Sequence, residues 1–340
     1  MTIWAAAAAF AAVLAAPASA QINAVNVGIF GATSDAPFFI ADKKGYFREE
    51  GIAVTLQKFQ SGEMMVPPLG TGELDVGAGS ASAGLYNAVA HGIKIKIVAD
   101  KASSPPGYGG TKLLVRKDLV ESGRYKTLHD IQGMKFAMNA PGVSNTAMLN
   151  DALTSVGLKY SDVEIVNFAA AMEHVAALAN KSVDAACAIE PAPALAVRNG
   201  SAVIVGSDDE ISPYHELAVL LYAENFTMKH PELAQKFMRA YIRAVRFYND
   251  ALQNGHLAGP NADELIAILT EYTGIKDAGI FRAITPTGMN PNGAVNVKSL
   301  AHDLAFYTAQ GLVKDKIDFD QLIDMSYADA VVKQLGPYKK

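Results

Sequence analysis

A pattern of elements that occurs twice, about 109 residues apart, limits the fold of this chain more than any other feature. Phe59, at a predicted strand end, and Asp75, at the start of the next strand, correspond at this spacing to Phe168 and Asp184. Elements in register at one spacing indicate a duplicated unit. The alternative is that doubly wound α/β domains look alike at this level, but the shared spacing favours duplication.

Strands and helices alternate within each copy. In the first copy the predicted strands are 25–30, 52–59, 74–79 and 93–100, and the predicted helices between them are 36–44, 61–69 and 82–90. Strands that alternate with helices of this length predict parallel sheets with helices on both faces, because such crossovers are right-handed. The sequence therefore predicts two doubly wound α/β lobes.

Two crossovers divide the chain between these lobes. A Gly/Pro-rich stretch at 103–110 predicts the first crossover, and the strand-like run 216–223 carries the chain back. We expect one lobe to comprise 21–108 plus 224–340 and the other to comprise 109–223, with a hinge between them. The remainder of the chain is predicted to be a C-terminal helical segment that packs on the first lobe.

The N-terminus has the composition of a signal peptide. Its first twenty residues carry no charge, are rich in Ala, and end in Ala18-Ser19-Ala20, the small-residue pattern of a cleavage site. We expect cleavage after Ala20 and a periplasmic protein. The single cysteine, Cys187, permits no intrachain disulfide and is expected to be an inert buried residue.

Charge and histidine placement narrow the possible partners. The net charge is −5, with acidic and basic residues interleaved, so no basic stripe predicts a nucleic-acid or anionic-membrane partner. The seven histidines show no metal-binding spacing, and only His215 is expected near a cleft. We expect a monomer that has no metal and no cofactor.

Candidate site residues lie where predicted strands end, because open α/β sheets bind ligands outside the carboxyl ends of their strands. Several are small polar residues that open a helix, where free N–H groups favour an anion. Ordinary N-capping explains any one of them, so convergence from both lobes is what favours a site. The candidates are Ser34, Asp35, Phe38, Ser61, Gly62, Ser80, Ala81, Tyr108, Ser144, Asn145, Thr146, Glu190 and Tyr214.

Two motifs leave an enzyme open as an alternative. The run 80–84 is similar to a nucleophile elbow, but it begins with serine instead of glycine and no partnered His and acid can be named. Gly77, Gly79 and Asp100 are spaced as in a dinucleotide-binding unit, although Ser82 replaces the third glycine. We expect a binding protein that has no enzymatic activity. An NAD-type oxidoreductase is the alternative.

Four segments together resemble a known family. They are 37–52 (PFFIADKKGYFREEGI), 72–77 (GELDVG), Glu190-Pro191 and 290–293 (NPNG). With these the chain resembles the substrate-binding proteins of ABC importers for nitrate, sulfonate, taurine and thiamine-precursor pyrimidines. The resemblance implies a type II periplasmic binding fold, two lobes that close over a small molecule, and docking to an ABC permease in the inner membrane. A sensor protein that binds without transport is a further alternative.

Two kinds of ligand remain open. A sulfonate or carboxylate would depend on N–H groups and hydroxyls, because Lys101 is the one cationic residue near the predicted strand ends. A nitrogen heterocycle with its own donors would instead find partners in Asp35 and Glu190 and stacking faces in Phe38 and Tyr108.

Overall fold

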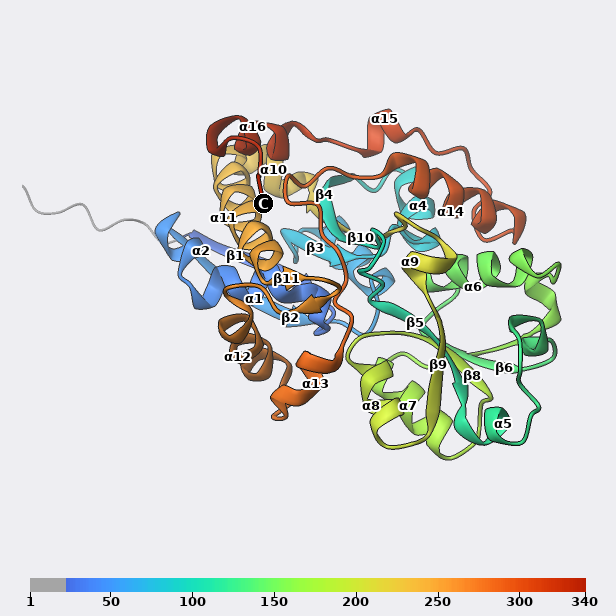
Figure 1. Cartoon of the computed structure of the whole chain (residues 1–340). Coiled ribbons are helices and arrows are strands. Elements are labelled where there is room, and N and C mark those ends of the chain that lie inside the picture. Colours follow the sequence, from blue (N-terminus) through green and yellow to red (C-terminus); the bar gives the residue numbers. More distant parts are fainter. Residues whose placement is uncertain (1–22) are drawn as a thin grey trace, which may run out of the picture.

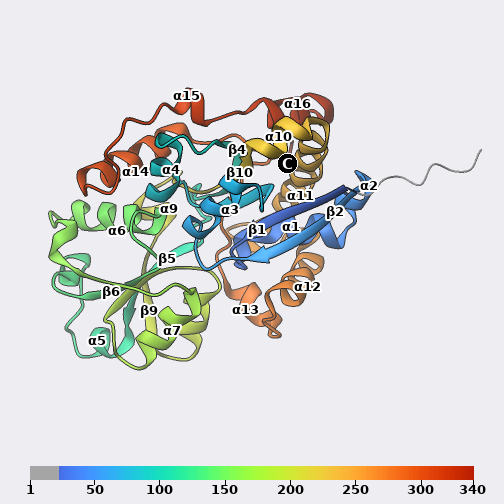
Figure 2. The same cartoon turned by 180° about the vertical axis from the view of Figure 1, so that it is seen from behind.

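The computed structural model describes residues 23–340, which form two α/β lobes connected by two crossing segments (Figure 1). The predicted signal peptide, 1–20, lies outside the described residues. The two lobes agree with the predicted fold class. In both views α14 (Val297–Ala309) of the first lobe approaches α6 (Ser144–Ser155) of the second (Figure 1, Figure 2).

The first lobe is built on a five-stranded sheet of order β2-β1-β3-β10-β4. Its strands are β1 (Asn23–Ile29), β2 (Ile52–Lys58), β3 (Val76–Gly79), β4 (Ile95–Ser103) and β10 (Glu216–Ala223). β1 runs parallel to β2 and β3, whereas β10 runs antiparallel to both of its neighbours.

The second lobe repeats this arrangement with a sheet of order β7-β6-β8-β5-β9. Its strands are β5 (Thr111–Arg116), β6 (Lys135–Met138), β7 (Glu164–Asn167), β8 (Ala185–Ile189) and β9 (Ala202–Ser207). β6 runs parallel to β7 and β8, and β5 is the antiparallel strand. A small hairpin of β11 (Leu252–Gln253) and β12 (His256–Leu257) lies apart from both sheets.

The duplication extends to individual hydrogen bonds. The carboxylate of Asp75 accepts the N–H of Asn26 at 2.8 Å, and Asp184 accepts the N–H of Lys135 at 3.1 Å, both across 49 residues. Lys135, the donor in the second lobe, and Asp184, the acceptor there, correspond to Asn26 and Asp75 at the predicted offset. The predicted repeat is therefore a structural repeat.

Two expectations about the sheets need correction. Both sheets are mixed instead of parallel, because β5 and β10 are inserted antiparallel from the crossovers. The run 216–223, assigned to the second lobe, is β10 of the first sheet, where it pairs with β3 and β4. β10 is buried along its whole length, and such a continuous apolar run shows that a strand is buried without giving its direction or its sheet.

Helices cover both faces of the sheets. One group comprises α1 (Ala36–Lys43), α3 (Val66–Thr71), α4 (Ala83–Ala90), α6 (Ser144–Ser155), α7 (Ala171–Ala179), α8 (Ala192–Arg198), α11 (Pro231–Asp250), α12 (Ala262–Thr273), α14 (Val297–Ala309) and α16 (Ser326–Leu335). The others are α2 (Tyr46–Glu49), α5 (Lys117–Glu121), α9 (Asp208–Ile211), α10 (Glu224–Lys229), α13 (Ala278–Ala283) and α15 (Phe319–Leu322). α3 tolerates two prolines because they fall in its first turn, where N–H groups need no partner within the helix.

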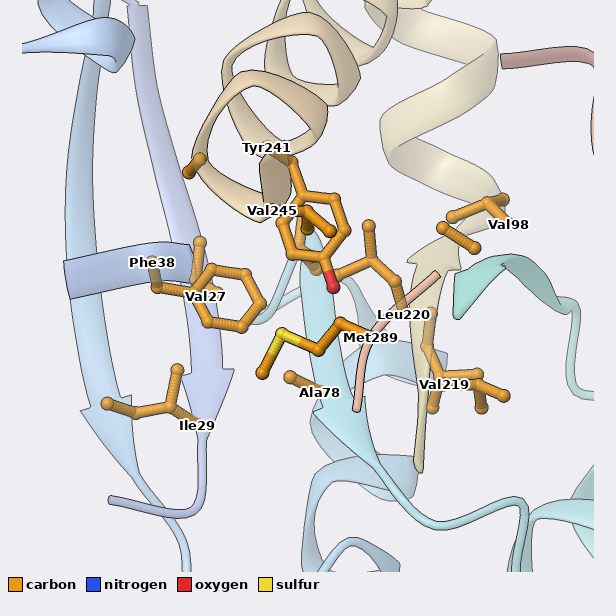
Figure 3. Packing of buried hydrophobic residues seen from close by; sticks show 14 of the residues in the cluster. Val27, Ile29, Phe38, Ala78, Val98, Val219, Leu220, Tyr241, Val245 and Met289 are labelled. Carbon is orange, nitrogen blue, oxygen red and sulfur yellow. The ribbon is translucent and has the colours of Figure 1, made fainter. Parts of the chain in front are cut away.

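The C-terminal segment completes the core of the first lobe. α11 lies over the sheet and brings Tyr241 against Phe38 of α1, with ring centroids 5.4 Å apart (Figure 3). Val27 of β1, Leu220 of β10 and Met289 from a later loop surround this pair. The predicted packing of the C-terminal helical segment on the first lobe is thus confirmed.

Candidate functional site

A cavity of about 80 Å³ lies between the two lobes. Its first-lobe wall comes from the loops after β1 and β2 and from β3, β4 and β10, and its second-lobe wall comes from β5, β8 and the N-terminal end of α6. Of the predicted site residues, the cavity brings together Ser34, Ser61, Gly62, Ser80, Ser144 and Asn145. It lies at the carboxyl ends of the parallel strands, as expected for open α/β sheets.

Lys101 of β4 lines this cavity and is held by two first-lobe residues. Its Nζ lies 2.8 Å from Asp35 Oδ1 and donates to Ser34 Oγ at 2.7 Å. The side chain is 2% exposed. Within residues 23–340, Lys101 is the one cation that lines the cavity.

Asp35 does not line the cavity, which corrects its predicted role as a ligand acceptor. Its Oδ2 accepts the N–H groups of Phe30, Gly31 and Ala32 at 2.5–3.1 Å, and its Oδ1 faces Lys101. An aspartate just after a turn commonly accepts N–H groups of its own loop. Asp35 therefore positions the lysine and the loop, and no carboxylate oxygen is left for a solute.

Ser80 and Ser144 meet across the cavity, one from each lobe. Their Oγ atoms lie 2.9 Å apart, and Ser80 also donates to the carbonyl of Leu217 at 3.2 Å. Because the Ser80 hydroxyl proton is directed to that carbonyl, Ser144 is the donor between the two serines. The hydroxyl of Ser80 thus links both lobes at the wall of the cavity.

Other contacts join the lobes around the cavity. The N–H of Ala83 donates to the carbonyl of Gly142 at 2.8 Å. Farther out, His302 of α14 lies 2.8 Å from Asp151 of α6, and Tyr160 packs edge-on against Phe306 with centroids 5.1 Å apart. The structure therefore has the two lobes in direct contact.

Asn145, near the start of α6, has a fixed amide orientation. Its Nδ2 donates to Asn139 Oδ1 and to the carbonyl of Cys187, both at 3.1 Å. Since a carbonyl accepts only from a donor, the nitrogen must lie on this side. Asn145 Oδ1 is then left buried without a hydrogen-bond donor among the described residues, in a side chain that lines the cavity. The site thus offers an acceptor as well as donors.

Gly62 and Gly79 bring the loop after β2 against the end of β3. A Cβ atom on Gly79 would lie 2.7 Å from the Cα of Gly62, so neither position has room for a side chain. Gly77 is likewise filled by the side chain of Leu69 at 2.7 Å. The glycines that predicted a dinucleotide unit therefore serve packing within the lobe. Asp100, assigned to a ribose in that alternative, is fully buried behind the cavity.

The predicted aromatic stacking faces do not reach the cavity. Phe38 is buried in the core against Tyr241, and Tyr108 packs on the same core. Tyr214 is 60% exposed and lies outside the cavity. Phe38 lies inside α1, and its side chain packs in the core of the first lobe.

Three further predicted residues support the site without lining it. Thr146 Oγ1 donates to the carbonyl of Val143 at 2.7 Å, and Ala81 is buried. Glu190 is 1% exposed, and its carboxylate accepts the N–H of Ala194 at 3.1 Å. Burial raises the pKa of Glu190 to about 7. The backbone carbonyl of Glu190 links the two lobes, because it accepts a hydrogen bond from the hydroxyl of Thr33 at 2.9 Å.

Several residues that line the cavity were not among the predicted site residues. Three of them could have been identified from the repeat. Asn139, Val143 and Ile189 line the cavity and are the counterparts, at the predicted offset, of Phe30, Ser34 and Ser80, which also line it. Thr111 of β5 and Leu217 and Ala218 of β10 had no such signal, because both strands come from the crossovers.

The remaining expectations concern single residues. His215 is buried and paired with Asp303 at 2.8 Å, and it does not line the cavity. Cys187 is a buried free thiol whose pKa is raised by burial.

No group of three or more metal-ligating side chains occurs within 23–340. In the same range no helix is long and apolar enough to cross a membrane.

Sequence comparison identifies a protein family and two relatives that this chain resembles. The sequence profile of the NMT1-like family matches residues 18–259. The taurine-binding periplasmic protein of Escherichia coli is 26% identical over 269 residues, which cover 76% of this chain and 77% of that protein. The nitrate import ATP-binding protein NrtC of Synechococcus elongatus is 27% identical over 251 residues, or 71% of this chain. The matched region spans only 38% of the length of NrtC.

Solved structures share the fold at lower identity. The periplasmic nitrate-binding protein NrtA of Synechocystis has a TM-score of 0.74 at 15% identity, covering 93% of this chain and 90% of that one. The desulfurization enzyme DSZB has a TM-score of 0.62 at 14% identity, covering 92% and 99%. At such identities the likeness concerns the fold, and the fold alone does not decide between binding and catalysis.

Proposed function

The chain belongs to the NMT1-like family, and we propose that it is the periplasmic solute-binding component of an ABC importer. One observation carries the proposal. The inter-lobe cavity lies at the strand ends of both sheets, and Ser80 and Ser144 close it from opposite lobes at 2.9 Å. Two lobes that are joined by two crossing segments can open by hinge motion and close over a small molecule.

The relatives support the location and the partner. A taurine-binding relative named as periplasmic and a relative from a nitrate import system both match most of this chain. A binding protein in that compartment delivers its solute to a permease in the inner membrane. The closed arrangement is then the form that the permease recognises, and the protein performs no chemistry on the solute.

The lining of the cavity favours a small anionic solute. Lys101 Nζ and the hydroxyl of Ser34 supply donors, whereas Asp35 is engaged within its own lobe. The volume of about 80 Å³ is well below the ~300–1,000 Å³ of pockets for drug-sized ligands. A sulfonate, nitrate or short carboxylate fits these donors better than a heterocycle that brings donors of its own. Asn145 Oδ1 is free to accept an N–H from an anion that also carries an amino group.

A thermal-shift screen tests this function. We expect nitrate, taurine, short alkanesulfonates or small carboxylates to raise the melting temperature, since a ligand at 100 times its Kd adds about 2.7 kcal/mol to stability. Pyrimidines and NAD serve as comparison ligands. Stabilisation by NAD, with no effect of any small solute, would contradict the proposed function and support the oxidoreductase alternative.

Replacing Lys101 with methionine tests the class of solute. Loss of a buried charge-assisted hydrogen bond costs about 1.5–3 kcal/mol, so affinity for the anion that gives the largest shift should fall by about tenfold to a hundredfold. Calorimetric titration measures this change. Lys96→Met is the matched control, because Lys96 lies on the same strand but hydrogen-bonds the carbonyl of Gln321 away from the cavity. Equal affinities for both variants would exclude Lys101 as an anion ligand.

A further inference from the structure

Two buried carboxyl groups lie close together behind the cavity. Asp100 of β4 and Glu216 of β10 are on neighbouring antiparallel strands, and Ser103, which lies opposite Glu216, donates its hydroxyl to Asp100 Oδ2 at 3.3 Å. No N–H group or hydroxyl of the described residues reaches Asp100 Oδ1 or Glu216 Oε1. These two oxygens are therefore the ones available for the contact between the carboxyls.

The other oxygen of each carboxyl group holds one loop, 290–296, which we term the hinge loop. Asp100 Oδ2 accepts the N–H of Asn290, and Glu216 Oε2 accepts the N–H of Asn296 at 2.6 Å. The N–H of Asp100 donates to the carbonyl of Gly293 at 2.9 Å. The hinge loop is thus fastened to the pair at both of its ends.

The pair lies directly behind the wall of the cavity. Lys101 follows Asp100 on β4, and Leu217 follows Glu216 on β10, and both of these next residues line the cavity. The two strands are also those that connect to the crossovers between the lobes. A change in the distance between the two carboxyls would therefore move both the solute site and the base of the hinge.

Two carboxylates in contact cannot both be ionised in a buried site, because like charges at this distance repel strongly. We propose that Asp100 and Glu216 share a single proton, and that this proton holds β4, β10 and the hinge loop in the geometry that the solute site needs. The pair is a positioning pair, since neither residue lines the cavity. Its effect on solute affinity rests on the proposed function, whereas the shared proton and the loop do not.

The electrostatic environment favours Glu216 over Asp100 as the holder of the shared proton. Burial raises the pKa of Asp100, and its hydrogen bonds to Glu216 and to the N–H of Asn290 lower it. Burial and the neighbouring charge of Asp100 hold the pKa of Glu216 well above its ordinary value. We therefore assign the shared proton to a Glu216 carboxylic acid, which donates it to the Asp100 carboxylate.

The direction of the pH effect follows from this raised pKa. The folded protein keeps the Glu216 proton at pH values where the unfolded chain has released it, so stability falls as pH rises from the ordinary glutamate range to the folded pKa. Above the folded pKa both carboxyls are charged, and the hinge loop loses part of its attachment. Solute binding should weaken in the same alkaline range.

Other groups lie near Asp100 and Glu216, and the effects of their titration must be distinguished from those of the pair. On α14, Asp303 lies near Glu216 and pairs with His215. Burial lowers the pKa of His215, but the charge and hydrogen bond of Asp303, together with the charges of Asp208 and Asp151, raise it overall. On α11, the hydroxyl of Tyr241 donates to the backbone carbonyl of Asp100 at 3.0 Å. Because deprotonation of His215 also destabilises the fold as pH rises, the experiment must alter Glu216 itself.

Glu216→Gln is the decisive variant, because its amide donates to the Asp100 carboxylate as the protonated acid does but cannot titrate. Infrared spectroscopy of the solute-free protein at about pH 8.5 should show the band of a protonated carboxylic acid, and Glu216→Gln should lack it. This pH lies above the pKa of about 7 to which burial raises Glu190 and Asp208, so those carboxyls are mostly ionised. Glu271→Gln, at an exposed side chain, is the control that retains the band.

Hydrogen exchange supplies the second readout. After correction for intrinsic rates, protection of the Asn290 and Asn296 amides should fall by up to about tenfold per pH unit above the pKa of the pair. In Glu216→Gln it should stay within about twofold over the same range. Should that variant not fold, Asp100→Asn places the amide donor on the other strand. Absence of the acid band in the native protein, or the same pH profile in variant and native protein, would overturn the proposal. Both readouts need no solute, so they are independent of the proposed function.

Discussion

Replacing Asp35 with alanine is expected to lower the free energy of unfolding by about 3–5 kcal/mol, because it breaks a buried ion pair from one side. Lys101 would keep a charge at 2% exposure with its carboxylate partner removed. The N–H groups of Phe30, Gly31 and Ala32 would lose their shared acceptor in the same step. Urea unfolding at neutral pH measures the loss.

A neighbouring aspartate supplies the control. Asp42 lies on α1 and accepts the hydroxyl of Tyr272 at the surface, so Asp42→Ala should cost no more than about 1 kcal/mol. Asp35→Ala combined with Lys101→Met should recover part of the lost stability, since the uncompensated charge is then removed as well. Equal losses for Asp35→Ala and Asp42→Ala would show that the buried ion pair does not hold the first-lobe loop.

A single methyl group at Gly142 is expected to reduce solute affinity by at least about tenfold, because it would separate the lobes. A Cβ atom there would lie 2.5 Å from the Cβ of Ala83 in the other lobe, well inside van der Waals contact. The N–H of Ala83 and the carbonyl of Gly142, now 2.8 Å apart, would be forced apart with the cavity beside them. Calorimetric titration with the strongest anionic binder measures the loss.

Gly157→Ala is the matched control for backbone strain. Gly142 and Gly157 both have positive φ, +66° and +78°, so alanine costs a similar ~1–2 kcal/mol at either position. A Cβ on Gly157, however, meets no atom within 4 Å. Gly157→Ala should therefore lose stability but keep the affinity of the native protein. If both variants bind equally well, closure of the lobes at Gly142 is not required for binding.

The duplicated fold could be predicted from sequence because corresponding elements of the two copies are separated by a nearly constant number of residues. Elements at a constant offset stay aligned whatever their side chains, and the carboxylates of Asp75 and Asp184 accept equivalent N–H groups in the structure. The direction of β5 and β10 could not be predicted, because a buried strand has the same composition in either direction. The lobe boundary at 223 failed for the same reason, since β10 returns to the first sheet.

The candidate site was predictable by position and only partly by residue. Small polar residues at strand ends, such as Ser80 and Ser144, lie at the cavity because backbone geometry brings strand ends together. Asp35 and Glu190 were expected to bind a solute, but one turns back on its own loop and the other contributes a backbone carbonyl. The sequence shows that a side chain is polar, but which polar group it meets depends on the tertiary fold.

Hydrogen exchange with and without solute tests most directly whether a small anion is held between the two lobes. The native protein is compared alone, with the anion that raises its melting temperature most, and with NAD. We predict slower exchange with the anion in both lobes at once, around Ser80–Ala83 and around Val143–Asn145, which flank the cavity. Protection confined to one lobe, or protection given by NAD alone, would contradict a solute site formed by closure of two lobes.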